Sequence, residues 1–331
     1  MNRNKINCWE YMKCSRGPKQ ENNVCPAVLD SSFDGMNDGT NAGRSCWLIA
    51  GTGCKGSASE TFAKGFRKCR KCEFFKQVHA KNDQITLGIK NIDVVACTHT
   101  GLVLKANEDR YLVRNMNDNA LLLGVADGLG GDVSSDVAAE LAKGRLATLD
   151  NLPTGNESEF LDKFAKNLDI YIHKKAENNS RLTYMATTLV CTILKDDMIH
   201  WVNIGDSRFY ILRNGKLIQI TKDQTLAKAL VEEGKLKPEE ANGHYSQKIL
   251  DQCLGYGVCE PDTGKFKVKK NDVIVLVTDG LYKMVAHDLI IKILNNDNNL
   301  KQKITALMDA ALSFGGKDNI TIILAHIKQT L

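Results

Sequence analysis

Acidic residues stand beside glycines or turns at the ends of several short apolar runs in this chain. The run 121–126 ends at Asp127-Gly128, and the run 274–278 ends at Asp279-Gly280. The other acids in comparable places are Glu108, Asp109, Asp206 and Asp318. Glycine permits tight turns and close backbone approach, so carboxylates that are far apart in the sequence can converge on one point.

Carboxylates that converge repel one another unless cations neutralise them. Hard oxygen ligands of this kind suit Mg²⁺ or Mn²⁺. A single Asp-Gly pair is more often a plain turn, but its repetition at the ends of apolar runs favours a divalent-metal site. None of the seven histidines lies in these acidic segments, which fits an oxygen-only site and argues against a zinc hydrolase.

The elements that position these acids are predicted from the apolar pattern. Short runs rich in Val, Ile and Leu predict strands at 93–97, 120–126, 188–194, 199–203, 209–212, 273–277 and 320–325. Helical spacing predicts helices at 132–149, 158–177, 290–295 and 300–312. The strand runs come in groups and the helices in pairs, which favours a layered α+β sandwich over an alternating parallel sheet.

Six segments, in order along the chain, resemble the metal-dependent protein phosphatase family, the type 2C class, and especially its bacterial members. They are Thr98-His99-Thr100-Gly101 with Asn107-Glu108-Asp109; Val125-Ala126-Asp127-Gly128-Leu129-Gly130-Gly131; Met185-Ala186-Thr187-Thr188-Leu189; Asn203-Ile204-Gly205-Asp206-Ser207-Arg208; Val277-Thr278-Asp279-Gly280-Leu281; and Gly316-Lys317-Asp318-Asn319-Ile320-Thr321. The resemblance implies a β-sandwich of two antiparallel sheets flanked by helix pairs over residues 91–328. It also implies a protein serine/threonine phosphatase that acts on phosphoprotein substrates.

The same resemblance implies a centre of two Mn²⁺ or Mg²⁺ ions that ionise a shared water for direct attack on phosphorus. The residues that it assigns to metal binding and catalysis are the side chains of Asp127, Asp279 and Asp318, the carbonyl group of Gly128, and Glu108 and Asp109, which bind the metals directly or hold their waters. Direct attack by water requires no phosphorylated side chain.

Two positions of the resemblance bear on a third metal and on substrate binding. Asp206 matches an aspartate that, together with Asp279, can hold a weaker third metal in bacterial relatives. The family commonly places an arginine that grips the substrate phosphate four residues before the glutamate, but this chain has Leu104 there. The adjacent Lys105 can bind phosphate as a point charge, without the bidentate fork of arginine.

Residues 221–255 resemble a mobile flap that lies beside the active site in this family and influences substrate choice. The residues alone fit a solvated helix–loop–helix equally well. Arg208 could approach the phosphate or form a structural ion pair, and we favour the ion pair.

The cysteines divide the chain. Seven of the eleven lie in the first 72 residues: Cys8, Cys14, Cys25, Cys46, Cys54, Cys69 and Cys72. So small a segment needs staples to hold a core, and its two Cys-Trp pairs resemble a module attached to bacterial signalling proteins. Zn²⁺ is our leading candidate for these cysteines, with an iron–sulfur cluster or a thiol redox switch as the alternatives.

These patterns predict a cysteine-rich domain at 1–78 that regulates or localises the enzyme, a polar linker at 79–90 and the phosphatase domain at 91–328. The basic residues next to Cys69 and Cys72 are expected to lower the pKa of these thiols. The other four cysteines are scattered singly and are expected to be buried hydrophobes.

The composition limits the kinds of molecule that this protein is expected to bind. The net charge of +5 is spread along the chain without a basic block, which argues against nucleic acid. No apolar stretch is long enough to cross a bilayer, and we expect a cytoplasmic protein. A cognate kinase or an anti-sigma-type regulator could be a partner. The alternative function is a non-catalytic phosphatase-fold scaffold, or a redox or metal sensor in signalling.

Overall fold

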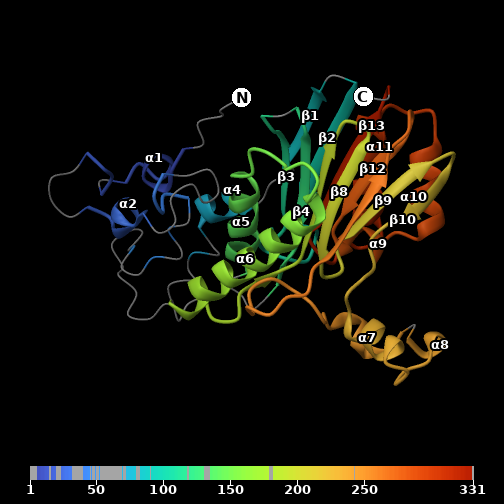
Figure 1. The fold of residues 1–331 in the computed structure, drawn as a ribbon. Helices are drawn as coiled ribbons and strands as arrows, with labels where there is room; N and C mark the ends of the chain where they lie inside the picture. The colour runs from blue at the N-terminus through green and yellow to red at the C-terminus, as the bar shows by residue number, and fades with distance from the viewer. Residues whose placement is uncertain are drawn as a thin grey trace. The chain divides into compact units, whose positions relative to one another are not determined.

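The computed structural model describes residues 6–14, 16–19, 24–31, 40–44, 46, 49, 52, 69, 72–79, 83–89, 91–117, 119–129, 135–178, 182–241 and 243–329. The chain divides into two compact units, Met1–Lys81 and Asn82–Leu331. Figure 1 shows the elements of both units along the chain. None of the described helices is both long and apolar enough to cross a membrane.

Two antiparallel sheets form the second unit. The first has the order β1-β2-β13-β12-β9-β10, and the second has the order β11-β8-β7-β4-β3. The strands of the first are β1 Asp83–Ile89, β2 Ile92–His99, β13 Ile320–Ile327, β12 Val273–Val277, β9 Arg208–Arg213 and β10 Lys216–Gln219. Those of the second are β11 Asp262–Lys267, β8 Met198–Ile204, β7 Leu189–Lys195, β4 Leu121–Ala126 and β3 Arg110–Asn115, and a short pair joins β5 Gly128–Leu129 to β6 Ala186–Thr187.

The sheets pack face to face, and the alternation of side chains explains the continuous apolar runs. In β2, Val94 and Ala96 belong to a core cluster shared with β4 of the other sheet. Their neighbours Val95 and Cys97 belong to a second cluster on the opposite face of the strand. Successive side chains of a strand point to opposite faces, so a strand that is covered on both faces is apolar throughout.

Helices cover both outer faces (Figure 1). The helices α9 Asp279–Tyr282, α10 His287–Asn295 and α11 Leu300–Ser313 contribute to the outer cluster of the first sheet. The helices α5 Ser135–Leu146 and α6 Glu157–Glu177 pack against strands of the second sheet. The predicted α+β sandwich of two antiparallel sheets flanked by helix pairs is confirmed.

Between β10 and β11 the chain forms a helical insertion of α7 Leu226–Glu232, α8 Pro238–Ala241 and the 3₁₀ helix η5 Tyr245–Lys248. It falls within the segment 221–255 that resembles a flap. In Figure 1, α7 and α8 extend away from the sandwich.

The predicted polar linker at 79–90 is wrong for most of its length. Residues Asp83–Ile89 form strand β1, which pairs along its whole length with β2, from Asp83↔Thr98 to Ile89↔Ile92. Ile85 packs against the core cluster between the sheets. The segment is half apolar because β1 is an edge strand with one neighbour, and a strand of this kind can face solvent on one side.

The first unit contains the short helices α1 Cys8–Tyr11, α2 Pro26–Leu29 and α4 Glu73–His79. Its buried side chains include Trp9 and Phe74, and the ring of Phe74 lies 5.3 Å from that of Tyr11. Cys8, Cys25 and Cys46 are buried and Cys14 is exposed.

The thiols of this unit differ in their environments. A hydrogen bond with Cys46 lowers the pKa of Cys8, whereas burial and then the charge of Cys72 raise the pKa of Cys69 to about 11. The expected lowering is therefore wrong for Cys69, because burial disfavours the thiolate. Cys54 lies outside the described residues.

Candidate metal centre

The topology brings strand ends from both sheets to one edge of the sandwich. In the second sheet, Asp109 immediately precedes β3 and Asp127 immediately follows β4; these antiparallel strands pair Arg110 with Ala126. In the first sheet, the amide of Thr278, at the end of β12, donates to the carbonyl of Thr321 at the start of β13 (3.1 Å). Asp279 and Asp318 flank this second junction. The ends of antiparallel neighbours therefore deliver four acids to the same edge.

The electrostatics show how close these acids are. Burial, and then the charges of Asp109, Asp279, Asp206 and Asp318, raise the pKa of Asp127 well above its usual range. Each of these carboxylates makes its neighbours harder to ionise, as carboxylates that share a site do. The acids singled out from the sequence, apart from Glu108, thus belong to one coupled cluster.

Asp109 is the most deeply buried member, with 2% of its surface exposed. Burial raises the pKa of its carboxyl group to about 8; hydrogen bonds from Thr321 and Thr278 oppose the shift, and the charges of Asp279 and Asp318 add to it. The hydroxyl of Thr278 donates to Asp109 Oδ2 at 2.8 Å. The other oxygen, Oδ1, is buried and has no hydrogen-bond partner among the described residues.

Asp279 has the same feature: its Oδ1 is buried and without a partner in the described part of the chain. A buried oxygen that accepts no hydrogen bond costs about 1–3 kcal/mol, and more when it is charged. A divalent cation coordinated by these oxygens would remove that cost, so the all-oxygen donor set fits Mg²⁺ or Mn²⁺. Among the described residues, no three acidic, histidine or cysteine side chains are already arranged around a single metal position.

Glycines make the close approach possible, as the sequence predicts. A Cβ atom on Gly128 would lie 2.3 Å from the carbonyl oxygen of Ser135 and 2.9 Å from that of Glu108. A Cβ on Gly280 would lie 1.9 Å from the carbonyl oxygen of Asn319. The backbone next to Asp127 therefore passes against Glu108, and the backbone next to Asp279 passes against the segment that carries Asp318.

Comparison with known proteins identifies this arrangement. Residues 99–322 match the family model of protein phosphatase 2C. The chain belongs to the protein phosphatase 2C family. It is 35% identical over 234 residues to the serine/threonine protein phosphatase PstP of Mycobacterium tuberculosis, covering 68% of this chain and 45% of that protein. It is likewise 35% identical to the serine/threonine phosphatase stp of Listeria monocytogenes, over 69% of this chain and 93% of that protein.

The solved structures agree with the sequence relatives. A crystal structure of the mycobacterial PstP has a TM-score of 0.66 at 32% identity, over 72% of this chain and 99% of that one. A structure of the PstP catalytic domain in complex with two manganese ions has a TM-score of 0.62 at 32% identity, over 71% of this chain and 97% of that one. The chain spans less than half the length of the whole mycobacterial relative.

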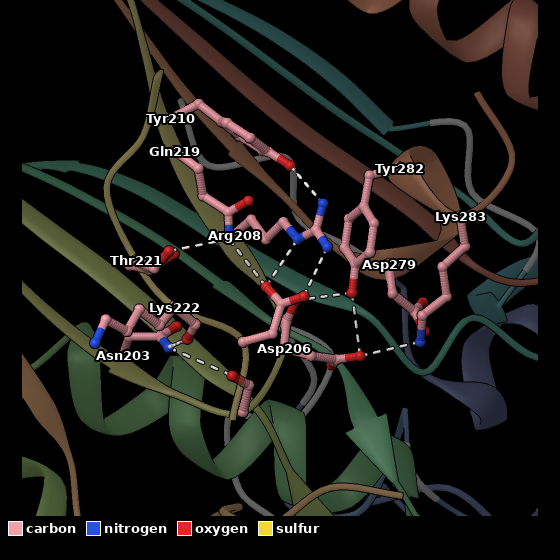
Figure 2. Close-up of polar contacts among 12 residues, drawn as sticks. Asn203, Asp206, Arg208, Tyr210, Gln219, Thr221, Lys222, Asp279, Tyr282 and Lys283 are labelled. Atoms are coloured by element: carbon pink, nitrogen blue, oxygen red, sulfur yellow. Dashed lines mark hydrogen bonds and ion pairs between the residues drawn. The ribbon is translucent and has the colours of Figure 1, made fainter. Parts of the chain in front are cut away.

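In this member of the 2C family, Asp206 is surrounded by hydrogen-bond donors (Figure 2). Its Oδ2 accepts from Lys283 Nζ at 3.0 Å and from the Tyr282 hydroxyl at 3.1 Å. Lys283 Nζ also lies 2.5 Å from Asp279 Oδ2. Burial would lower the pKa of Lys283, but the charges of Asp279 and Asp206 outweigh it and raise that pKa. The lysine is therefore a firmly charged bridge between two acids of the cluster.

Arg208 forms the structural ion pair that we favoured. Its Nε and one terminal nitrogen donate to the two carboxylate oxygens of Asp223 at 2.8 and 2.6 Å. Its guanidinium lies 3.5 Å from the centroid of the Tyr282 ring. Both contacts occupy the charged end of the side chain (Figure 2).

The loop between β2 and β3 carries Leu104 and Lys105, and both side chains are exposed. The same loop leads to Glu108, whose backbone amide donates to Asn319 Oδ1 at 2.7 Å. The side-chain amide of Asn319 in turn donates to the carbonyl groups of Thr100 and Ala106, at 2.8 and 2.9 Å. Asn319 therefore fixes the loop against the segment that carries Asp318.

Several residues around the acids were not predicted from the sequence: Thr278, Tyr282, Lys283, Asn319 and Thr321. Lys283 had a detectable signal, because it follows Asp279 by four residues at the start of a helix, where such side chains are neighbours. Thr278, Asn319 and Thr321 lie inside segments that resemble the family, but no role was assigned to them. Their contacts join segments that are far apart in the chain, so the sequence does not show them.

Proposed function

We propose that this chain is a protein serine/threonine phosphatase that hydrolyses phosphomonoesters at a centre of two Mn²⁺ or Mg²⁺ ions. The observation that carries the proposal is a cluster of mutually repelling carboxylates. One oxygen each of Asp109 and Asp279 is buried there and has no hydrogen-bond partner among the residues that the structure describes. Membership of the 2C family, and relatives named as serine/threonine phosphatases, support the substrate class.

In this proposal the side chains of Asp127, Asp279 and Asp318 and the carbonyl group of Gly128 hold the metals. When bound, the metals supply Lewis acidity and a water that ionises near neutral pH. Thr278 fixes the orientation of Asp109 by its hydrogen bond. Asn319 holds the backbone of Glu108, so that this acid reaches the centre from the loop before β3.

The test is hydrolysis of a chromogenic aryl phosphate and of a phosphothreonine peptide, with and without Mn²⁺. We expect metal-dependent turnover that falls by about 10³-fold or more in Asp127→Asn. The variant loses a ligand of the metal ions, whose positive charge stabilises the transition state. Asp162→Asn is the matched control, since Asp162 lies on α6 in a surface ion pair. Equal turnover in the wild type and Asp127→Asn would favour the non-catalytic scaffold.

We further propose that Lys105 partly replaces the phosphate-binding arginine that the family commonly has at the position of Leu104. Lysine offers one strongly hydrated charge, so it binds a phosphate less firmly than the arginine fork. Leu104→Arg is expected to lower KM for the aryl phosphate by about 5–10-fold, and Lys105→Met to raise it about 3-fold with little change in kcat. An unchanged KM in both variants would remove this loop from the substrate site.

The cysteine-rich unit is proposed to regulate or localise the enzyme, with Zn²⁺, an iron–sulfur cluster or a dithiol as its working group. The hydrogen bond between Cys8 and Cys46 supports this proposal. Burial raises the pKa of Cys25, and the nearby charges of Cys8 and Cys14 add to that shift. None of the ten described cysteines is part of a disulfide bond, which suits a reducing cytoplasm. A cognate kinase or an anti-sigma-type regulator would be the partner to seek.

Metal analysis of anaerobically purified protein tests the ligand of this unit. Deletion of residues 1–81 tests its role, and the cut must stop there because β1 belongs to the sandwich. We expect the shortened chain to keep its turnover of the aryl phosphate and to lose its response to oxidants or its protein partners. If turnover, redox response and partners all stay unchanged, the regulatory role is wrong.

A further inference from the structure

Lys283 forms ion pairs with two acids of the cluster, Asp279 and Asp206. Its ammonium group is 2.5 Å from Asp279 Oδ2 and 3.0 Å from Asp206 Oδ2 (Figure 2). The Asp206 residue is 4% exposed. One ammonium thus bridges two largely buried carboxylates, and charge-assisted hydrogen bonds of this kind are about twice as strong as neutral ones.

The side chain of Asp206 is held by a second donor. The Tyr282 hydroxyl donates to Asp206 Oδ2 at 3.1 Å and lies 2.9 Å from its backbone oxygen. Tyr282 is itself fixed by the guanidinium of Arg208, 3.5 Å from the ring centroid, and Arg208 is fixed by the two oxygens of Asp223. These contacts, which involve no metal, clamp Asp206 to the end of α9, and Arg208 of β9 fixes one of the two donors.

The two oxygens of Asp279 differ in the same respect. Its Oδ2 faces Lys283, whereas its Oδ1 is buried and has no partner among the described residues. A divalent cation can approach Oδ1 without meeting the ammonium. A cation that bridged Asp279 Oδ2 and Asp206 Oδ2 would have to occupy the position of Lys283 Nζ or face its like charge at close range, where repulsion is strong in a partly buried site.

We propose that Lys283 is a built-in cation that takes the place of a divalent ion between Asp206 and Asp279. The metal centre of this chain then holds two divalent ions and excludes a third at Asp206. This inference rests on the proposed function, because it assumes that the remaining acids bind the two catalytic ions. It makes Asp206 a structural partner of Lys283 rather than a metal ligand.

The test counts the Mn²⁺ ions bound per chain by equilibrium dialysis with elemental analysis, and by titration calorimetry, in the protein of residues 1–331. We expect about two ions at the phosphatase centre of the wild type, with the ions of the cysteine-rich unit subtracted by a parallel count on Asp127→Asn/Asp279→Asn. Lys283→Met keeps the length of the side chain and removes its charge. It is expected to bind one more Mn²⁺ than the wild type.

Three further variants define the cause. Lys283→Arg keeps the charge and should keep the wild-type count. Lys283→Met/Asp206→Asn removes the extra acid along with the ammonium and should return to the wild-type count. Lys267→Met is the matched control, because Lys267 makes a comparable ion pair with Asp197, at 2.8 Å, on a strand outside the cluster.

The outcomes separate the two proposals. The same count in the wild type and Lys283→Met, or one more ion already present in the wild type, would overturn the role of Lys283 and leave the phosphatase proposal intact. A wild type that binds no Mn²⁺ at the acids and shows no metal-dependent turnover would overturn both. If Lys283→Met does not fold, the count on the wild type and Lys283→Arg still decides, since a third ion in either contradicts the inference.

Discussion

Asp109 and Asp169 are aspartates buried to nearly the same degree, 2% and 1% exposed, in opposite surroundings. Asp169 lies on α6, and its Oδ1 accepts backbone amides of Gly255 and Gly257 at 2.6 and 3.0 Å. Its Oδ2 accepts the amide of Cys259 at 2.9 Å. Asp109 accepts a hydrogen bond on Oδ2 only, and the described residues offer nothing to its Oδ1.

The difference separates an acid that completes the fold from an acid that needs something further. Asp169 fixes the loop after the helical insertion to α6, and both of its oxygens are satisfied by the chain. The described residues leave an oxygen of Asp109 buried and unsatisfied, at a cost in free energy that a bound ligand would recover. Burial is common to both aspartates, so the unsatisfied oxygen is what distinguishes the functional acid.

The largest expected effect is on activity. Asp109→Asn should lower the Mn²⁺-dependent kcat/KM for an aryl phosphate by about 10³-fold. The free energy of unfolding of the chelated protein should not fall, because the substitution replaces a carboxyl group that is costly to ionise in this cluster with a neutral amide. Hydrolysis assays and urea unfolding in EDTA measure the two quantities. Retained activity with a large loss of stability would make Asp109 a structural acid like Asp169.

For Asp169→Asn we expect a loss of stability with little change in activity, the opposite of Asp109→Asn. Asp169→Asn should lower the free energy of unfolding by about 2–4 kcal/mol, because an amide cannot accept all three backbone N–H groups. The kcat of the folded fraction should change by less than about 3-fold, since the hydrogen bonds that the described residues show for Asp169 lead to the loop 255–259 and not to the acid cluster. Asp162→Asn, on the exposed face of the same helix, is expected to change stability by less than about 0.5 kcal/mol.

A pH dependence of stability follows from the raised pKa of Asp109. Its carboxyl group titrates at about 8 in the fold, chiefly because of burial, against 3.8 when unperturbed. Between these values the folded protein keeps a proton that the unfolded chain has lost. The contribution to stability is therefore complete below about pH 4 and is lost as the pH rises towards 8, by up to about 1.4 kcal/mol per pH unit for one proton.

Urea unfolding of the chelated wild type and of Asp109→Asn across this pH range isolates the effect. The difference between the two free energies should change with pH in the expected direction, and Mn²⁺ should abolish the change by holding the carboxylate ionised. Parallel pH profiles for the two proteins in EDTA would contradict the shift.

The sequence predicted the sandwich because its strands are buried on both faces. The run 121–126 is apolar throughout, and all of β4 is buried. The edge strand β1 was missed, because an edge strand needs only part of its length to be apolar. Ile85 reaches the core, while Leu87 is 39% exposed, and a half-polar segment of this kind looks like a linker.

The acids of the site were predicted for a related reason. Asp127 and Asp279 each follow an apolar run and precede a glycine, and this local pattern can be recognised in the sequence alone. The bridge from Lys283 to Asp206 depends on how α9 lies against the end of β8, across 77 residues of sequence. Contacts of that kind are fixed by tertiary packing, so no local pattern could reveal them.

The smallest effect is expected at Arg208, which pairs with the carboxylate of Asp223 and supports Asp206 through Tyr282. Arg208→Lys should lower the free energy of unfolding by about 1–2 kcal/mol, because lysine loses the fork to Asp223 and the stacking on Tyr282. It should also weaken the clamp on Asp206 and change the Mn²⁺ concentration that gives half-maximal activity by about 2–5-fold. Manganese titrations of the variant measure this change.

Arg213 provides a matched comparison at the other end of β9. It donates to both oxygens of Asp272 at 2.9 and 2.6 Å, and its guanidinium lies 4.8 Å from the centroid of the Phe266 ring. Arg213→Lys should therefore cost about as much stability as Arg208→Lys. It should leave the Mn²⁺ titration unchanged, because in the described part of the chain Phe266 packs against the core between the sheets and not against the acid cluster. An equal shift in both variants would mean that Arg208 stabilises the sheet without positioning Asp206.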